Sequence, residues 1–243
     1  MKKKNINLGV NIDHIATLRN VRNDGYIDLI EISKILRSLC VDSLTIHLRE
    51  DRRHILDEDV INLKKSNVLP INLEMAPTNF MKNFCFKIEP FACCIVPEKR
   101  EEITTEGGLD VKKNFKFLKN IIDKLKKKNI RVSLFIEPNL KDIEIAKQLG
   151  SDAVELHTGK FSRLFSKTGG DKEFIKLNKA AVFATDIGLE CHAGHGLNFQ
   201  NVKKIISIPE IVELNIGYFI IAESVKYGIK KVIQDLQKII YKD

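Results

Sequence analysis

Short apolar, β-branched runs alternate eight times with longer runs that carry apolar residues at helical spacing, and this alternation constrains the fold more than any other feature. Short β-branched runs are typical of strands, and longer amphipathic runs are typical of helices. Strict alternation of the two predicts a parallel sheet with right-handed crossovers. The strand-like runs are Asn7–Asp13, the start of Ser43–Ile55, Pro70–Ala76, Phe91–Val96, Arg131–Ile136, Ala153–Thr158, Leu189–Ala193 and Ile211–Ile216.

The number of units and the chain length together favour a closed barrel. Eight units in 243 residues fit a (β/α)8 barrel, a fold that typically takes about 250 residues. No linker or shift in composition divides the chain, so we expect a single barrel domain over residues 1–243. A doubly wound open sheet remains as the structural alternative, because it is built from the same alternation.

Helical spacing follows the strand-like runs, and a few polar residues mark helix ends. We expect Asp57, Thr78 and Asn198 to act as N-caps and Gly150 to end a helix. Arg19 and Arg22 are expected in a loop. The expected helical segments are Ile27–Leu39, Asp57–Leu63, Thr78–Phe84, Phe115–Leu125, Ile143–Leu149, Lys172–Asp186, Asn198–Ile206 and a last stretch that ends at Ile240.

Composition limits the partners and the compartment. The net charge of +8 favours anionic partners, but the lysines scatter over helix faces and the chain has no tryptophan, so no nucleic-acid partner is expected. The five cysteines are odd in number and form no C-x-x-C motif, which indicates a reducing compartment. No run approaches the roughly 18 apolar residues of a membrane span, and the basic N-terminus lacks the apolar region of a signal peptide. We therefore expect a cytoplasmic protein without a membrane partner.

Titratable residues gather at the C-terminal ends of the strand-like runs. In (β/α)8 enzymes these ends and the loops after them build the active site. No histidine lies in an expected helix, and so many ionisable groups on one rim predict a catalytic site. The histidines are His14, His47, His54, His157, His192 and His195, and the acids in similar positions are Asp13, Glu74, Glu98, Glu137 and Glu155.

Four of these residues have the chemistry of proton transfer. His47 titrates in the range of a general acid or base. Glu74 lies between apolar neighbours, so burial would raise its pKa if it faces the barrel mouth, and otherwise it would form a salt bridge with Arg49 or Arg53. Glu155 is in mid-strand and must be paired or protonated; it could stabilise a cationic iminium or orient a basic residue. His192 and His195 face opposite ways on an extended chain, and the glycines around His195 favour it as the site residue.

Anions have two candidate sites. One is formed by the loops after the last two strands, where Gly194, Gly196 and Gly217 can expose backbone N–H groups beside helix N-termini. The other is the arginine-rich loop Arg49–His54, of which Arg49, Arg52, Arg53 and His54 are the basic members. Nucleotide binding has no support, because no P-loop or G-x-G-x-x-G is present. His47, Glu74, His157 and His195 are possible metal ligands, but no short ligand motif occurs, so no metal is expected.

Several long segments resemble the pyridoxine 5′-phosphate synthase family, which makes vitamin B6 by the deoxyxylulose-dependent route. The similar segments run in order along almost the whole chain, and together they are specific to this family. They are Gly9–Asn20, Thr45–Ile55, Asn72–Ala76, Val96–Val111, Val132–Pro138, Glu155–Gly159, Ala193–Asn198 and Glu213–Gly217.

The resemblance implies a (β/α)8 barrel with extra helices that condenses 1-deoxy-D-xylulose 5-phosphate with 3-amino-2-oxopropyl phosphate. The products are pyridoxine 5′-phosphate, phosphate and water. It also implies no metal or organic cofactor, and a homo-octamer built from dimers. By resemblance, His47 and Glu74 accept protons, His195 donates one, and Glu155 stabilises a transition state. The implied substrate-binding residues are Asp13, His14, Arg49, His54 and Thr104 for the deoxyxylulose phosphate, and Asn11, Arg22, Gly196, Gly217 and Tyr218 for the amino ketone.

The chain departs from the family pattern at a few positions. Tyr218 stands where a histidine is usual, which makes its contact the least secure of those implied. Residues 39–42 replace a small-residue turn, and Glu223 replaces a common arginine; both changes are expected to be structural. Another phosphosugar barrel, such as an aldolase or epimerase, is the alternative function. A Schiff-base aldolase would need a lysine at a strand end, and none of the eight runs ends in one.

Overall fold

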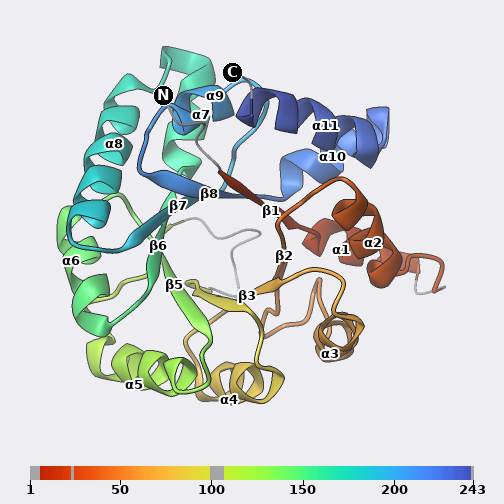
Figure 1. Cartoon of the computed structure of the whole chain (residues 1–243), viewed down its shortest axis with the longest axis horizontal. Coiled ribbons are helices and arrows are strands. Elements are labelled where there is room, and N and C mark those ends of the chain that lie inside the picture. The colour runs from red at the N-terminus through yellow and green to blue at the C-terminus, as the bar shows by residue number, and fades with distance from the viewer. Residues whose placement is uncertain (1–5, 23–24, 99–106, 242–243) are drawn as a thin grey trace.

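Eight parallel strands in sequence order close into a barrel in the computed structural model, which describes residues 6–22, 25–98 and 107–241 (Figure 1). This closure confirms the (β/α)8 fold and removes the open-sheet alternative. The strands are β1 (Asn7–Asn11), β2 (Ser43–His47), β3 (Ile71–Met75), β4 (Ala92–Ile95), β5 (Arg131–Ile136), β6 (Ala153–His157), β7 (Glu190–Gly194) and β8 (Ile211–Ile216).

Helices surround the barrel, and three of them are additions to the basic unit. The outer ring is α2 (Leu29–Ser38), α3 (Asp57–Ser66), α4 (Asn79–Ile88), α5 (Phe115–Lys126), α6 (Leu140–Leu149), α8 (Asp171–Asp186), α9 (Val202–Ile206) and α11 (Ile229–Ile240). The additions α1 (Asp13–Arg22), α7 (Gly159–Thr168) and α10 (Tyr218–Tyr227) directly follow β1, β6 and β8. In Figure 1, α1 and α10 lie nearer the barrel axis than α2 and α11.

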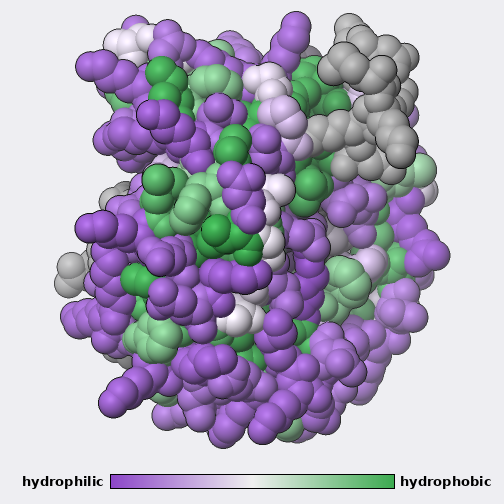
Figure 2. All heavy atoms as spheres, turned by 60° about the vertical axis from the view of Figure 1, so that its left-hand side comes forward, coloured by the Kyte–Doolittle hydropathy of each residue, from purple (hydrophilic) through white to green (hydrophobic). Residues whose placement is uncertain are grey.

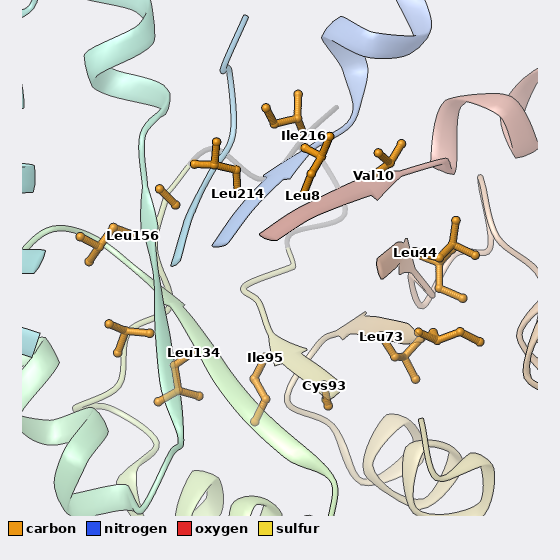
Figure 3. Packing of buried hydrophobic residues seen from close by; sticks show 14 of the residues in the cluster. Leu8, Val10, Leu44, Leu73, Cys93, Ile95, Leu134, Leu156, Leu214 and Ile216 are labelled. Carbon is orange, nitrogen blue, oxygen red and sulfur yellow. The ribbon is translucent and has the colours of Figure 1, made fainter. Parts of the chain in front are cut away.

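Residues that alternate along each strand face two different environments. One set points outward and packs against the helices, as Leu8, Leu44 and Leu134 do in Figure 3. Nearly all of this set is fully buried, and it forms the main apolar core. The other set points inward and is largely polar, with buried Thr45 and Glu155 among its members. The chain is therefore stabilised by the shell between sheet and helices, while the barrel interior is left for polar groups.

Two interior glycines make room for the polar side chains. A Cβ on Gly9 would lie 2.1 Å from Oδ1 of Asn215 and 3.0 Å from Oγ of Ser43. A Cβ on Gly194 would lie 2.1 Å from Oε1 of Glu155. Neither position tolerates a side chain while Asn215 and Glu155 keep their places.

Helices α1 and α7 were not predicted from the sequence. Because His14 lies in α1, the expectation that no histidine is helical was wrong for this residue. Helix α1 occupies the region expected as a loop, so Arg19, Arg22 and His14 are helical. Its apolar residues do not form an inward stripe, because Leu18 and Val21 are exposed, and helical periodicity is therefore weak. Helix α7 was missed for a similar reason; Phe161 and Phe165, four residues apart and in edge contact, were its available signal. The last expected helix is two helices, separated at Gly228 with φ +78°.

The expected helix ends are correct in two cases and shifted in two. Thr78 caps α4 by accepting the Met81 N–H, and Gly150 ends α6 in the left-handed conformation. Asp57 is the first residue of α3 and not its cap; Asp59 accepts the N–H of the cap residue instead. Asn198 accepts the N–H groups of the two residues before α9, so it stabilises the turn that leads into the helix.

The surface of the barrel is mainly hydrophilic. Figure 2 shows the side that carries α6 and α8, where apolar residues form only small groups among charged ones. Ile175 and Val182 of α8 are among the apolar side chains that remain partly exposed. Within the described ranges, no helix combines the length and apolar character needed to cross a membrane.

Substitution of Gly9 by alanine should destabilise the barrel. The new methyl group must displace Asn215, and overpacking of this kind costs about 1–3 kcal/mol of the free energy of unfolding. Gly107→Ala is the matched control, because among the described residues the atom nearest to its Cβ would be Oε1 of Glu137 at 3.9 Å, and it should change stability by less than about 0.5 kcal/mol. Urea denaturation of both variants measures this, and equal stabilities would contradict the packing described.

Candidate active site

A cavity of about 620 Å³ opens at the C-terminal ends of the strands. Its walls come from the ends of β1, β2, β3, β6 and β8 and from the loops that follow. Of the fourteen catalytic and substrate-binding residues that the family resemblance implies, twelve line it: Asn11, Asp13, His14, His47, Arg49, His54, Glu74, Glu155, His195, Gly196, Gly217 and Tyr218.

The two exceptions are Arg22 and Thr104. Arg22 is the last residue of α1, where it is exposed and does not reach the cavity. Thr104 lies outside the described residues.

His47 and Glu74 are neighbours because β2 and β3 pair in a register that aligns them. Nδ1 of His47 lies 3.7 Å from Oε2 of Glu74. The backbone N–H of His47 donates to Oδ1 of Asp13 at 2.9 Å. The side chain of His47 is buried and that of Glu74 is 17% exposed, at the wall of the cavity, so the two can exchange a proton directly.

Burial raises the pKa values of two carboxyls that face this pair. For Glu74 the pKa is well above the ordinary range, because the group is desolvated and lies near the charges of Glu155 and Asp13. Desolvation also raises the pKa of Glu155 to about 7, with Glu213 adding to the effect and His192 opposing it. Among the residues that the structure describes, neither glutamate pairs with an arginine. Burial therefore favours the protonated form of Glu74, and Glu155 can lose or gain a proton near neutral pH.

A hydrogen-bonded amide holds Glu155 in the barrel interior. Nδ2 of Asn215 donates to Oε2 of Glu155 at 2.8 Å, and Oδ1 of Asn215 accepts from the Thr45 hydroxyl at 2.8 Å. The sequence interpretation offered pairing or protonation for Glu155, and the structure supplies both. Asn215 was not identified from the sequence, because an asparagine in a strand gives no signal of its partner.

His195 has a strained backbone that aims it into the cavity. Its φ of +80° is unusual for a residue with a side chain. The Thr158 hydroxyl donates to the carbonyl oxygens of Gly194 and His195, at 2.7 and 2.6 Å, and so fixes this turn. Burial, with further effects from His157 and Arg163, lowers the pKa of His195 to about 4. In the empty site His195 is therefore neutral.

His157 and His192 do not line the cavity. His157 packs against His195 with ring centroids 5.1 Å apart, and its Nδ1 lies 2.7 Å from Oε1 of Glu137. His192 is at the opposite end of the barrel, with Nδ1 3.4 Å from Glu213. The structure thus puts His195, and not His192, on the cavity.

The arginine-rich loop Arg49–His54 contributes fewer side chains to the cavity wall than its composition suggests. Arg52 is paired with Asp57, and Arg53 is paired with Asp51. Neither lines the cavity, so their inclusion in the anion site was wrong. Arg49 is buried in the cavity wall, and His54 lies beside it with Nδ1 2.6 Å from the Thr17 hydroxyl.

The second anion position is the start of α10. Gly217 precedes this ten-residue helix and lines the cavity, so the free N–H groups of the first turn lie at the cavity wall. A Cβ on Gly217 would lie 2.8 Å from Cβ of Asn11, which explains the glycine. Tyr218 stands at the rim, 69% exposed, with its ring 5.2 Å from that of His14. Glu223, expected to be structural, also lines the cavity.

Potential metal-ligand atoms of Asp13, His47 and Glu74 lie within 4.8 Å of one another. This set differs from the ligands considered in the sequence. Asp13 already accepts hydrogen bonds from the His47 N–H and from Asn11 Nδ2, and burial raises the pKa of Glu74, which favours its neutral form. The donor set is therefore better suited to proton transfer than to a cation.

Solved structures of low sequence identity share this fold. The chain superposes with a TM-score of 0.66 on 3-keto-L-gulonate-6-phosphate decarboxylase from Vibrio cholerae, with 11% identity and 98% of each chain covered. It gives the same score with orotidine 5′-monophosphate decarboxylase from Methanocaldococcus jannaschii, with 15% identity and 98% and 99% covered. Fold and site together define a (β/α)8 barrel whose cavity, at the C-terminal ends of the strands, is lined by histidine and carboxyl side chains.

Sequence comparison identifies the family. The model of the pyridoxal phosphate biosynthesis protein PdxJ matches residues 8–242. A pyridoxine 5′-phosphate synthase of Ehrlichia chaffeensis is 50% identical over 233 residues, 96% of each chain. One of Pelagibacter ubique is 48% identical, with 96% of this chain and 98% of the relative covered. The chain belongs to the PdxJ family, which confirms the resemblance seen in its sequence.

Ionisation of Glu155 should make stability fall as pH rises. In the unfolded chain this carboxyl ionises near pH 4.5, whereas in the fold its pKa is about 7. Between these values the folded state binds the extra proton, so stability is greatest below the unfolded pKa and is lost as pH passes 7. The loss is about 3 kcal/mol for this group.

The test compares wild type with Glu155→Gln by urea denaturation at pH 5 and pH 8. The amide cannot ionise but can still accept from Asn215, so the variant should lose about 3 kcal/mol less than wild type between these pH values. Glu144→Gln, at an exposed position on α6, should behave as wild type. An unchanged pH dependence in Glu155→Gln would refute the raised pKa.

Proposed function

We propose that this enzyme of vitamin B6 biosynthesis condenses 1-deoxy-D-xylulose 5-phosphate with 3-amino-2-oxopropyl phosphate. The products are pyridoxine 5′-phosphate, phosphate and water, as expected of a pyridoxine 5′-phosphate synthase. The observation that carries the residue roles is the buried His47–Glu74 pair, with Glu155 in the same cavity. Such a ring-forming condensation needs protons removed and returned at one place, out of contact with water.

His47 and Glu74 act as the proton acceptors. The amino ketone arrives as an ammonium ion, and its nitrogen must lose a proton before it attacks a ketone. The Glu74 carboxyl can take that proton while passing its own to Nδ1 of His47, 3.7 Å away. The positive charge then moves from the substrate to the imidazole, and no bulk water takes part.

Glu155 stabilises the cationic stage of the reaction. Attack of the amine on a ketone followed by loss of water gives an iminium ion. A nearby cation favours the ionised carboxylate, so the pKa of Glu155, raised to about 7 in the empty site, falls as the iminium forms. Attraction between carboxylate and iminium is strong in this buried setting.

His195 is the proton donor for a departing oxygen. With a pKa lowered to about 4 it is neutral in the empty site, so it must first gain a proton. A bound phosphate dianion favours the imidazolium and supplies the electrostatic reason for that gain. His195 can then protonate a leaving hydroxyl or phosphate and return to its neutral form.

The two phosphates bind on opposite sides of the cavity. For 1-deoxy-D-xylulose 5-phosphate we assign Arg49, His54, His14, Asp13 and Thr104, because the first three bring positive or hydrogen-bonding groups to one wall. For the amino ketone we assign Asn11, Gly196, Gly217 and Tyr218, which line the cavity around the start of α10. Arg22, at the exposed end of α1, is assigned by the family resemblance alone.

Other phosphosugar chemistries are less well supported. A Schiff-base aldolase needs a lysine amine at the reacting carbon. Among the described residues, no lysine lines the cavity. The reaction proposed uses no metal or organic cofactor, since its steps are proton transfers, additions to carbonyl groups, and eliminations of water and phosphate, none of which changes the overall oxidation state.

We further propose that residues 1–243 form a single barrel domain. We also propose that the protein works in the cytoplasm, without nucleic-acid or membrane partners, and assembles as a homo-octamer built from dimers. Exposed apolar side chains on the added helices support association. Leu18 and Val21 of α1 are 54% and 77% exposed, and Val225 of α10 is 80% exposed. Light scattering of the purified protein measures the assembly, and a monomer would refute this part.

The activity test combines both phosphorylated substrates with purified protein in the presence of a chelator. Pyridoxine 5′-phosphate, followed by fluorescence, and released phosphate should appear in equal amounts. His47→Ala and Glu74→Gln should each lower kcat by at least about 100-fold, the usual effect of losing a general acid–base group. Lys172→Ala, at an exposed position on α8, should keep full activity. Folded protein without turnover would overturn the proposal.

Ligand binding should return a proton to His195. In the empty enzyme its ring should remain neutral at pH 7, since its pKa is about 4. With 1-deoxy-D-xylulose 5-phosphate bound, the titration should move to higher pH. NMR of the ring carbons measures both states, and the His192 signals, at the far end of the barrel, serve as the control. A titration that does not respond to ligand would contradict the donor role.

A further inference from the structure

Glu98 lies directly behind His47, on the side away from Glu74. It follows β4 by three residues and its side chain is 3% exposed. Its Oε2 lies 3.6 Å from Nε2 of His47. Within the described part of the chain, these two atoms are both buried and both lack a hydrogen-bond partner. Two unpartnered polar atoms that face each other need a shift of only a few tenths of an ångström to form a hydrogen bond.

The other oxygen of Glu98 is held by the loop that follows β2. Oε1 accepts the backbone N–H of Glu50 at 2.8 Å and lies 3.9 Å from Nε of Arg49. Burial alone would favour the neutral acid, but contact with His47, the Glu50 N–H and Arg49 outweighs it, and the pKa of Glu98 is lowered. Glu98 is therefore a buried carboxylate in a fixed position.

We propose that Glu98 is a positioning residue that keeps the proton of neutral His47 on Nε2 and stabilises the imidazolium after proton transfer. The inference deepens the proposed function and rests on it for its effect on catalysis. Glu98 itself does not line the cavity. It acts through His47, as a buried carboxylate acts on the histidine of a hydrolase triad.

The tautomer of His47 decides whether its Nδ1 can accept a proton from Glu74. With the proton on Nε2, the lone pair is on Nδ1 and faces the Glu74 carboxyl. The substrate gives a proton to Glu74, Glu74 gives its proton to Nδ1, and His47 becomes an imidazolium between two carboxyl groups. With the opposite tautomer, Nδ1 would carry a hydrogen and could accept nothing from Glu74.

Other charged groups also act on His47 and must be kept constant in the test. Asp13 accepts its backbone N–H from the start of α1, and Glu74 faces it from β3. Arg49 and His54 belong to the loop that follows β2. A substitution at Glu98 leaves all four of these groups in place.

The experiment compares Glu98→Gln with Glu50→Gln. The first removes the carboxylate with little change of shape; the second removes the same charge from an exposed side chain of the adjacent loop and keeps the N–H that Glu98 accepts. Ring ¹⁵N shifts should show His47 with its proton on Nε2 in wild type and in Glu50→Gln, and a mixture of tautomers in Glu98→Gln. This readout needs no turnover, so it can fail or succeed independently of the proposed function.

Activity gives the second readout. Glu98→Gln should lower kcat at least tenfold, which is the usual effect of losing a residue that orients a functional histidine. Both KM values should stay within about threefold of those of wild type. Its pH profile should differ from that of wild type, and Glu98→Asp should recover part of the loss. In a His47→Ala background, Glu98→Gln should have no further effect, because residues that act as one unit are not additive. An unchanged tautomer, or an equal loss of kcat in that background, would overturn the proposal.

Discussion

Carboxyl groups inside the barrel are the constraint on which the rest of the structure depends. Many (β/α)8 barrels fill this space with layers of branched apolar side chains. Here Glu155 is buried among Asn215 and Thr45, and Glu74 lies near it. Desolvated carboxyls destabilise a fold unless they keep a proton or find donors. The apolar shell between the sheet and the helices must offset that cost, which is why the outward residues of the strands are almost uniformly aliphatic.

The same arrangement brings acids and bases together in one cavity. Asp13, Glu74 and Glu155 line it together with the basic side chains of His14, Arg49 and His54. The raised pKa of Glu74 and the lowered pKa of His195 are two effects of one cause, since burial disfavours the charged form of each group.

Strand register explains why much of the site could be predicted from the sequence. The alternation located the strand ends, and in a closed barrel these ends meet, so residues as distant as Asp13 and His195 could be assigned to one cavity. Prediction failed where a residue's role depends on its partner. Arg52 and Arg53 look like anion ligands until their ion pairs with aspartates are seen. Asn215 carries no signal in the chain, because its partners Thr45 and Glu155 are far from it in sequence.

The paired contacts of the interior glycines restrict how this family can diverge. Gly194 has no side chain because the Glu155 carboxylate occupies that space, and Gly9 has none because Asn215 does. Asn215 in turn donates to Glu155. These four positions form one mutational unit: a larger residue at either glycine becomes acceptable only after its polar neighbour has been shortened. Relatives that lose the acid should be free to vary at Gly194, so a side chain at that position would mark a lineage whose chemistry has changed.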